Sequence, residues 1–325
     1  MSNHLTQVNF ITPVQERIFE VEEKMRVQTD GHNPELGAAL QHLLSSGGKR
    51  IRPAVALLTG GMFGADPEKL VTLGAAIELL HTATLVHDDL IDGALLRRGI
   101  ATLNSQWTPA ATVLTGDFIF ARAAKLAAET NSVPVMRMFA ITLATIVNGE
   151  LTQLFASRGI ANQEGYYQRI YAKTASMFEL ATAASTMLSP KDDGVVEEMR
   201  SFGYNIGMAF QIVDDVLDFT AEQATLGKPV ASDLRQGLIT LPALFYLDGH
   251  PDDPEMQSIL RGHFFSDERM DRLVNAIRSS GSIQKSMDVA QEYIDFGLET
   301  LQKQPDCPER TALDELARYI VNRNI

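Results

Sequence analysis

An aspartate motif that occurs twice, each time within an apolar helical pattern, constrains this chain more than any other feature. The two copies are Asp88-Asp89-x-x-Asp92 and Asp214-Asp215-x-x-Asp218. In a helix, the first and last aspartates of each copy share one face, because residues four apart are neighbours there. Burial of unpaired carboxylates is costly, and no lysine or arginine lies one turn away from either copy. We therefore expect the counter-charge to come from bound cations.

The repetition of the motif argues for a metal site. A single copy could be a solvated helix face, but two copies framed by apolar residues make that alternative a poor account of the pattern. Carboxylate oxygens suit hard divalent ions, above all Mg²⁺. Mg²⁺ keeps part of its water shell and shares its coordination with phosphate oxygens. The motifs therefore predict a phosphorylated ligand held by Mg²⁺ between the two helices.

Composition limits the function classes that remain. The formal net charge of −13 and the isoelectric point near 5.0 argue against nucleic acid as a partner, since phosphate-backbone binding needs a basic surface. The single cysteine, Cys307, permits no internal disulfide and suits a reducing cytoplasm. The first residues lack a signal-peptide pattern, and no uninterrupted apolar stretch approaches the roughly 18 residues that a spanning helix needs. We expect a cytoplasmic protein with no nucleic-acid partner and no transmembrane segment.

Helical periodicity dominates the chain, and no alternating strand pattern competes with it. The predicted helices are 14–29, 35–45, 53–61, 67–92, 105–130, 135–157, 163–188, 195–221 and 240–247. Residues 249–325 are more charged, and their prolines and glycines indicate several smaller surface helices. Because no repeat or low-complexity linker divides the chain, the sequence predicts one all-α domain over residues 1–325.

Basic and polar residues near the two motifs are weak signals one by one. Gly47-Gly48-Lys49-Arg50-x-Arg52-Pro53 is a glycine turn followed by cations at a helix start, where an anion can bind. Arg97-Arg98 offers guanidinium groups for diphosphate oxygens, although a solvated helix end is the simpler explanation of that pair alone. Lys173-Thr174 places a cation and a hydroxyl on an apolar helix, and Gly227-Lys228-Pro229 is a tight loop with one cation.

Two further residues share faces with the aspartates. His81 lies seven residues before Asp88 on nearly the same helix face, and a core histidine with a satisfied hydrogen bond is the alternative to a ligand contact. Gln211 shares the face of Asp214 and Asp218, which makes it a candidate substrate contact.

These motifs, in this order, resemble those of trans-isoprenyl diphosphate synthases, and of the long-chain members such as octaprenyl, solanesyl and heptaprenyl diphosphate synthases. The resemblance runs from about residue 47 to residue 247 and also includes Glu78-Leu-Leu-His81 and Gly116-Asp117. It implies an all-α, single-domain bundle of about ten or more helices around a central cavity. It also implies a homodimer, and a transient membrane contact when a long product is released.

The resemblance implies a role for each motif residue. The six aspartates would hold two or three Mg²⁺ ions that bridge the diphosphate of an allylic substrate. Arg97, Lys173 and Lys228 would contact that diphosphate, while Lys49, Arg52, His81 and Arg98 would hold isopentenyl diphosphate. Thr174 and Gln211 would lie near the reacting carbons. Metal ions and cations make diphosphate a leaving group without proton transfer, and the resulting allylic cation is attacked by the double bond of isopentenyl diphosphate.

One residue departs from the family pattern. The family often has a lysine after the glycine of Asp-x-x-x-Gly-Lys-x-Thr-x-Pro, whereas this chain has Leu238 within Asp233-Leu-Arg-Gln-Gly237-Leu238-Ile-Thr240-Leu-Pro242. This chain therefore lacks the lysine that the resemblance associates with one phosphate contact.

Product length is predicted from the helix before the first motif. Short-chain members generally carry an aromatic residue four or five positions before the first aspartate, where this chain has Thr84 and Ala83. These small side chains leave the path of the growing chain open and predict a C30 to C50 product. The alternatives are a geranylgeranyl (C20) diphosphate synthase, a class I terpene cyclase and a non-catalytic partner subunit. A cyclase has no use for Lys49, Arg52 and His81, and a non-catalytic partner would not need both aspartate motifs.

Overall fold

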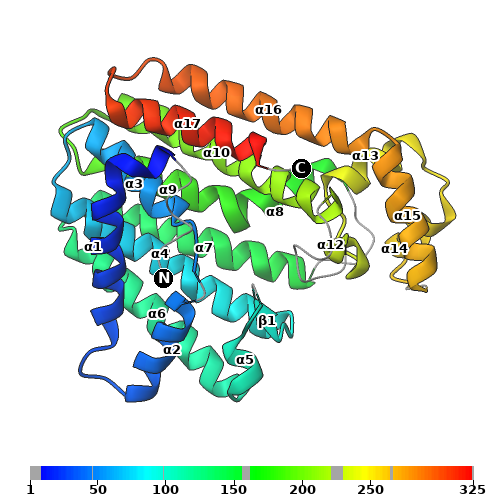
Figure 1. Cartoon of the computed structure of the whole chain (residues 1–325), viewed down its shortest axis with the longest axis horizontal. Coiled ribbons are helices and arrows are strands. Elements are labelled where there is room, and N and C mark those ends of the chain that lie inside the picture. Colours follow the sequence, from blue (N-terminus) through cyan, green and yellow to red (C-terminus); the bar gives the residue numbers. More distant parts are fainter. Residues whose placement is uncertain are drawn as a thin grey trace. The chain divides into compact units, whose positions relative to one another are not determined.

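The structure is a computed structural model that describes residues 9–45, 47–97, 99–155, 162–220, 230–263 and 266–323. Nearly all regular structure in these ranges is helical (Figure 1). The α-helices are α1 (Gln15–Arg26), α2 (Pro34–Ser45), α3 (Ile51–Met62), α4 (Pro67–Ile91), α5 (Leu103–Gln106), α6 (Pro109–Glu129), α7 (Val133–Phe155), α8 (Gln163–Ile170), α9 (Ser176–Met187), α10 (Asp193–Thr220), α12 (Ser232–Arg235), α13 (Leu241–Gly249), α14 (Pro254–Leu260), α15 (Asp267–Ser279), α16 (Ser282–Leu301) and α17 (Pro308–Asn322).

Three short helical segments of other types complete the helical part of the described chain. They are the 3₁₀ segments η1 (Asn9–Val14) and η2 (Val27–Thr29) and the π-helical turn η3 (Tyr171–Ala175). Two residues each form β1 (Leu96–Arg97) and β2 (Ile100–Ala101), which pair antiparallel with Leu96 opposite Ala101. The left-handed backbone of Gly99 (φ +77°) allows the tight turn between them.

The chain forms two compact units. The first unit comprises Met1–Leu143, Met177–Gly203 and Thr300–Leu316, and the second comprises Ala144–Ser176, Tyr204–Glu299 and Ala317–Ile325. The prediction of a single domain over residues 1–325 stays a prediction.

Helix α4 is the central element of the first unit. The Asp66 side chain caps its start by accepting a hydrogen bond from the amide of Glu68 at 2.9 Å, and Pro67 occupies the first turn. Buried residues cover every face of α4 from Leu70 to Leu80, and the helix packs most extensively against α6, then against α3 and α1. The helix ends at Ile91, because Gly93 takes a left-handed conformation (φ +64°) just beyond it. This arrangement brings the first aspartate motif to the end of a rigid core helix.

Small residues let helices of the first unit approach closely. A Cβ on Gly203 of α10 would lie 2.6 Å from the carbonyl oxygen of Phe178 and 2.2 Å from Thr182 Oγ1 on α9. A Cβ on Gly60 of α3 would meet the Leu70 side chain of α4 at 2.2 Å. A larger residue at Gly203 would meet the α9 backbone and force α9 and α10 apart, whereas one at Gly60 would require the Leu70 side chain to move.

The second unit has its own apolar core. Its buried members come from α10, α12, α13, α14 and α15 and the segment before α12, and they are Phe219, Ala231, Leu234, Ala243, Tyr246, Met256, Ile259, Met270, Leu273, Val274 and Ile277. Phe219 directly follows the second aspartate motif, so this core anchors the end of α10 that presents the motif.

Helical content is predicted better than helix boundaries. The predicted segment 67–92 matches α4 closely, but the predicted segment 163–188 is interrupted by the π-helical turn η3. The expectation of small surface helices after residue 249 is wrong for α16, which spans 20 residues, and for α17, whose Leu313, Leu316 and Ile320 are fully buried. Polar residues on the outer faces of these helices conceal their apolar stripes when the segment is judged by composition.

Two described helices are long and apolar enough to cross a membrane by length and composition alone, α4 and α7. Neither helix is an uninterrupted apolar stretch, since Glu78 lies within α4 and Arg137 and Glu150 lie within α7, and the absence of a transmembrane segment stays a prediction. In α4, 83% of the most apolar window is buried inside the protein, as expected of a core helix, whereas in α7 only 22% is buried. The exposed apolar face of α7 therefore needs a separate explanation.

Candidate active site

The first aspartate motif lies at the end of α4, in the first unit. Asp88 is partly exposed, Asp89 is buried with 5% of its surface accessible, and Asp92 is exposed where the helix ends. Asp88 and Asp92 are thus accessible carboxylates one turn apart, as the spacing predicts. The amide of Asp92 donates to the Asp88 carbonyl oxygen at 2.8 Å, which continues the helical pattern through the motif.

Arg97 neutralises the buried aspartate of this motif. Its Nε donates to Asp89 Oδ1 at 2.9 Å and to Oδ2 at 3.0 Å. The β1–β2 hairpin presents Arg97, and Thr102 fixes the hairpin by donating from Oγ1 to the Ala94 carbonyl oxygen at 2.7 Å. The expectation that no side chain compensates these acids is therefore wrong at Asp89, because the chain turns back after α4. Arg98 lies outside the described residues.

The basic residues of the glycine turn before α3, within residues 47–53, differ in burial. Arg50 has a left-handed backbone (φ 48°) and is 8% exposed. Its Nε donates to Glu22 at 2.9 Å, and its second guanidinium nitrogen donates to the buried Glu78, also at 2.9 Å. Burial lowers the Arg50 pKa, but Glu78 and Glu22 outweigh it, so the net pKa is raised. Arg50 is therefore a structural ion, which leaves its neighbours as the candidates for substrate.

Those neighbours have different environments. Lys49 is exposed, while the half-buried Arg52 holds its guanidinium carbon 5.1 Å from the ring centre of Phe178, a cation–π contact. His81 is partly buried on α4, and its carbonyl oxygen accepts a hydrogen bond from Thr84 Oγ1 at 2.8 Å. These three predicted substrate residues all belong to the first unit, as does Arg97.

The predicted chain-length residues lie in the buried part of α4. Ala83 is fully buried and Thr84 is 8% exposed. One turn further, His87 contacts α6: its Nε2 lies 3.2 Å from the Val113 carbonyl oxygen and 3.4 Å from Asp117 Oδ1. A Cβ on Gly116 would lie 2.4 Å from that nitrogen. The Gly116-Asp117 motif therefore provides space and a partner for His87.

The second aspartate motif lies near the end of α10, in the second unit. Asp215 is buried, while Asp214 and Asp218 are partly exposed, and the Asp214 side chain is 39% exposed. Arg323, which follows α17, donates to Asp214 Oδ1 at 2.7 Å and to the Phe210 carbonyl oxygen at 3.0 Å. The same guanidinium lies 4.2 Å from the Phe210 ring centre. Asp214 thus also has an arginine partner that the local sequence does not reveal.

Asp215 is buried and accepts two side-chain hydrogen bonds. Gln211 Nε2 donates to its Oδ1 and the Tyr166 hydroxyl donates to its Oδ2, each at 2.8 Å. Burial is the main cause that raises the pKa of Asp215 to about 7. The hydrogen bond from Gln211 lowers this pKa, and the nearby charge of Asp233 raises it further. Burial and Asp215 together raise the pKa of Tyr166 well above its usual value, so Tyr166 is a neutral donor.

Asp218 anchors the segment that follows the motif. Its Oδ1 and Oδ2 each accept a hydrogen bond at 3.1 Å, from the backbone amides of Ser232 and Asp233. Its carbonyl oxygen accepts from the amide of Ala231 at 2.7 Å, and Ala231 has a left-handed backbone (φ 54°). This carboxylate therefore holds the turn before α12.

The π-helical turn presents Lys173 and Thr174. Lys173 Nζ lies 3.2 Å from Glu150 Oε1 of α7, and Thr174 Oγ1 donates to Gln211 Oε1 at 2.6 Å. Gly149 lets α7 approach this turn, since a Cβ there would meet the Ala172 Cβ at 2.5 Å. An insertion of this kind in a helix often marks a functional site.

The predicted site residues thus form two groups. The second unit brings Lys173, Thr174 and Gln211 together beside the second motif, and the first unit contains Lys49, Arg52, His81, Arg97 and the first motif. Lys228 lies outside the described residues. In the described ranges no cluster of three or more His, Cys, Asp or Glu side chains is arranged to hold a metal ion by itself. The sequence patterns did not predict the contacts of Tyr166 with Asp215, of Arg323 with Asp214 or of Glu150 with Lys173.

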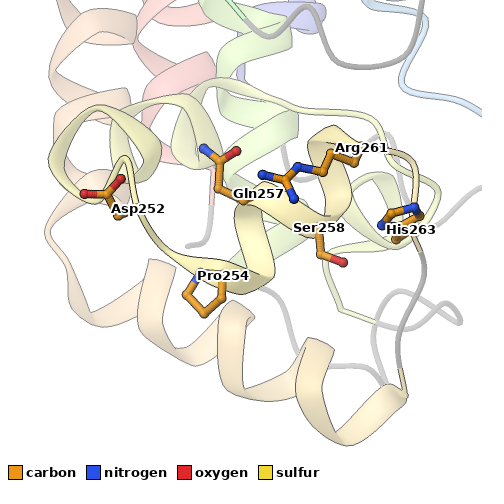
Figure 2. Close-up of a pocket in the computed structure, with 6 residues that line it drawn as sticks. All are labelled: Asp252, Pro254, Gln257, Ser258, Arg261 and His263. Carbon is orange, nitrogen blue, oxygen red and sulfur yellow. The ribbon is translucent and has the colours of Figure 1, made fainter.

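A surface hollow of about 510 Å³ lies at α14 (Figure 2). Its residues follow all of the predicted site residues in the sequence. Arg261 and His263 lie at one end of it and Asp252 at the other. Pro254, Gln257 and Ser258 complete its lining, and none of the six belongs to a predicted motif.

Comparison with known proteins gives the family. The polyprenyl synthetase family model matches residues 33–277. Octaprenyl diphosphate synthase of Escherichia coli (strain K12) is 36% identical over 287 residues, which cover 87% of this chain and 88% of that protein. Heptaprenyl diphosphate synthase component 2 of Geobacillus stearothermophilus is 34% identical over 305 residues, which cover 94% of this chain and 95% of that protein.

A solved structure shows the same fold. The polyprenyl synthase from Caulobacter crescentus CB15, complexed with calcium and isoprenyl diphosphate, has a TM-score of 0.91 at 34% identity, over 97% of each chain. The predicted all-α fold is thereby confirmed, as is the prediction of a prenyltransferase. With its aspartate motifs at the ends of two long helices, this chain belongs to the polyprenyl synthetase family.

Proposed function

We propose that this chain joins isopentenyl diphosphate to an allylic diphosphate, repeatedly, and so makes a trans-polyprenyl diphosphate. The observation that carries the proposal is the hydrogen-bonded set beside the second motif, in which Thr174 contacts Gln211 and Gln211 contacts Asp215. This set combines oxygen dipoles with a lysine and an accessible aspartate in one compact unit. Dipoles and charges of this kind stabilise a developing cation and a departing diphosphate.

Mg²⁺, with two or three ions per site, is the proposed cofactor. The donor set fits a hard cation, because Asp88, Asp92 and Asp214 expose carboxylate oxygens to solvent. We assign these three as direct ligands, with Asp214 also paired to Arg323. Asp89, Asp215 and Asp218 belong to the same two motifs, and each accepts hydrogen bonds within the protein. The calcium in the Caulobacter crescentus structure supports a hard, oxygen-bound ion. When bound, Mg²⁺ neutralises charge on the diphosphate leaving group.

The basic residues divide between the two substrates in this proposal. Arg97, Lys173 and Lys228 contact the allylic diphosphate, and Lys49, Arg52, His81 and Arg98 contact isopentenyl diphosphate. Guanidinium and ammonium groups stabilise the charge that collects on diphosphate as the allylic carbon–oxygen bond breaks. The double bond of isopentenyl diphosphate then attacks the allylic cation, and the departing diphosphate accepts the proton that is lost. Thr174 and Gln211 turn their oxygens toward the cation.

The proposed product is long, C30 to C50. Ala83 and Thr84 are small residues in the buried part of α4, one turn before Asp88. The octaprenyl and heptaprenyl synthases that resemble this chain over most of its length support a long product. A geranylgeranyl diphosphate synthase remains the alternative, and a class I terpene cyclase and a non-catalytic subunit rank below it.

We propose a homodimer that covers the exposed face of α7. Val147, Leu151 and Leu154 are 45%, 45% and 56% exposed, and their spacing of four and three residues places them on one face of the helix, while Ile141, 57% exposed, extends the apolar surface beside that face. No charged residue lies between Met138 and Gly149, so a second copy of the same face is a suitable partner. The name "component 2" of one relative points to a different subunit as the alternative. Light scattering of the Ile141→Glu, Leu151→Glu variant should show a monomer; an unchanged mass would reject this face.

The experiment that tests the function is product chromatography after incubation with Mg²⁺, labelled isopentenyl diphosphate and farnesyl diphosphate. A ladder that ends between C30 and C50 supports the proposal. A ladder that stops at C20 supports the geranylgeranyl alternative, and release of a hydrocarbon without elongation supports a cyclase. If the pure protein is inactive but becomes active with a second subunit, the partner alternative is correct. Activity that requires no membrane fraction would support a cytoplasmic location.

A further inference from the structure

Four polar side chains of the second unit form one continuous hydrogen-bonded chain. The Tyr166 hydroxyl donates to Asp215 Oδ2 at 2.8 Å, and Gln211 Nε2 donates to Asp215 Oδ1 at 2.8 Å. Thr174 Oγ1 then donates to Gln211 Oε1 at 2.6 Å. Tyr166, Thr174 and Asp215 are 2%, 4% and 4% exposed, so water does not compete freely for these bonds.

The carboxylate determines which end of the Gln211 amide faces Thr174. Asp215 accepts from the NH₂ end of the amide at Oδ1 and from the Tyr166 hydroxyl at Oδ2, so the carbonyl oxygen of the amide faces Thr174. The Thr174 hydroxyl then donates its hydrogen to Gln211, and its oxygen lone pairs can accept other contacts. With the amide reversed, a carbonyl oxygen would face the carboxylate and the positive end of the amide dipole would face Thr174.

We propose that Tyr166 and Asp215 are positioning residues, which lock the Gln211 amide so that the oxygens of Gln211 and Thr174 face the cation formed during prenyl transfer. The proposal rests on the proposed function for the identity of that cation. Asp215 accepts one hydrogen bond from Gln211 and one from Tyr166, and through these two bonds it orients Gln211. Tyr166 acts through Asp215, by holding the carboxylate from the side opposite Gln211.

The Tyr166→Phe variant isolates this role, because only the hydroxyl is lost. The ring keeps its contacts with the Arg169 guanidinium, 5.4 Å from the ring centre, and with the Tyr167 ring, also at 5.4 Å. We expect the rate of isopentenyl incorporation at saturating substrate to fall roughly tenfold, the factor that corresponds to about 1.4 kcal/mol for one hydrogen bond. KM for both substrates should stay within about twofold, as should the calorimetric affinity for Mg²⁺ with inorganic diphosphate. Tyr167→Phe, the same change one residue on, should leave the rate unaltered.

A double-mutant cycle tests whether Tyr166 acts through Gln211. In a Gln211→Leu background, Tyr166→Phe should have no further effect on the rate, since no amide remains to be oriented. In a Lys173→Met background, whose side chain is outside the hydrogen-bonded chain, the tenfold effect should persist. Equal effects in the two backgrounds would overturn the proposal, and so would a loss of Mg²⁺ and diphosphate affinity in Tyr166→Phe.

Crystal structures of the wild type and of Tyr166→Phe provide a readout that needs no activity. We expect the wild type to keep the Thr174 to Gln211 hydrogen bond and the variant to show a turned or multiple Gln211 side chain. If Gln211 is unmoved in the variant, the positioning role is wrong. If instead the wild type makes no prenyl product, the proposed function fails, but the crystal structures still decide whether Tyr166 orients Gln211.

Discussion

Arg97 reaches back eight residues to Asp89, and its Nε lies 2.9 Å from one carboxylate oxygen and 3.0 Å from the other. Arg323 makes the corresponding contact to Asp214, across 109 residues of sequence. Each aspartate motif therefore has one acid that an arginine neutralises before any metal ion binds. In the second motif the paired acid is Asp214, which is also one of the three proposed metal ligands, so a cation bound there would share this carboxylate with Arg323.

Replacement of Arg97 by Met should destabilise the first unit modestly. The variant leaves Asp89, which is 5% exposed, without its fork of donors. Since the Arg97 side chain is 37% exposed, solvent screens the pair, and we expect a loss of about 1 kcal/mol and a thermal midpoint about 2–4 °C lower. Calorimetry measures the shift. Arg26→Met, which removes an exposed pair with Glu23, is the control and should leave the midpoint unchanged.

Substitution of Arg50 should reduce stability, whereas substitution of Lys49 should weaken substrate binding. Arg50→Met leaves the buried Glu78 without its ion-pair partner, and we expect a loss of about 3–5 kcal/mol in unfolding free energy. Lys49 is exposed, so Lys49→Met should keep the thermal midpoint and raise KM for isopentenyl diphosphate. Thermal unfolding and steady-state kinetics on both variants check this. A Lys49 variant with an unchanged KM would remove that residue from the substrate site.

Arg323 should tether the end of α17 through Asp214. In Arg323→Met the contacts to Asp214, to the Phe210 carbonyl oxygen and to the Phe210 ring are all lost. We expect faster hydrogen exchange at the backbone amides of residues 317–323, by about tenfold if the contacts contribute about 1.4 kcal/mol. Asp214→Asn should give a smaller increase, and the double variant should match Arg323→Met. Additive effects would mean that the two residues act independently.

Enlargement of Ala83 or Thr84 should shorten the product. Ala83 is fully buried and Thr84 is 8% exposed on α4, so a phenylalanine there would fill the path proposed for the growing chain. We expect product chromatography to show shorter chains for Ala83→Phe or Thr84→Phe, with a smaller shift for Ala83→Val. Overpacking costs about 1–3 kcal/mol, so the thermal midpoint must be measured alongside. Folded, active variants with an unchanged product would place the chain-length determinant elsewhere.

Removal of metal should abolish turnover without unfolding the protein. Asp88 and Asp92 are accessible at the end of α4, while buried apolar residues hold that helix in place. We expect chelation by EDTA, or the Asp88→Ala change, to stop isopentenyl incorporation and to leave the far-ultraviolet circular dichroism unaltered. Added Mg²⁺ should restore the chelated wild type only. Turnover by Asp88→Ala at the wild-type rate would contradict the assignment of Asp88 as a metal ligand.

Helical periodicity was sufficient to predict α4 almost to the residue, because Asp66 and Pro67 mark its start and Gly93 marks its end. Spacing alone also predicted that Asp88 and Asp92 share a face. The π-helical turn at Tyr171–Ala175 was not predicted, because one inserted residue leaves the apolar pattern nearly intact. The burial of α17 was missed for a different reason: its outer face is charged, and only packing shows where Leu313, Leu316 and Ile320 lie.

The sequence by itself determined the helical class, the positions of both aspartate motifs and the resemblance to prenyl diphosphate synthases, because these depend on local spacing. Tertiary structure alone decided which acids are accessible and which are already bonded. Tyr166 lies 49 residues from Asp215, and Arg323 lies 109 residues from Asp214, so no local pattern connects them. Hydrogen bonds and ion pairs form between groups that folding brings within about 3 Å, and separation along the chain does not report that distance.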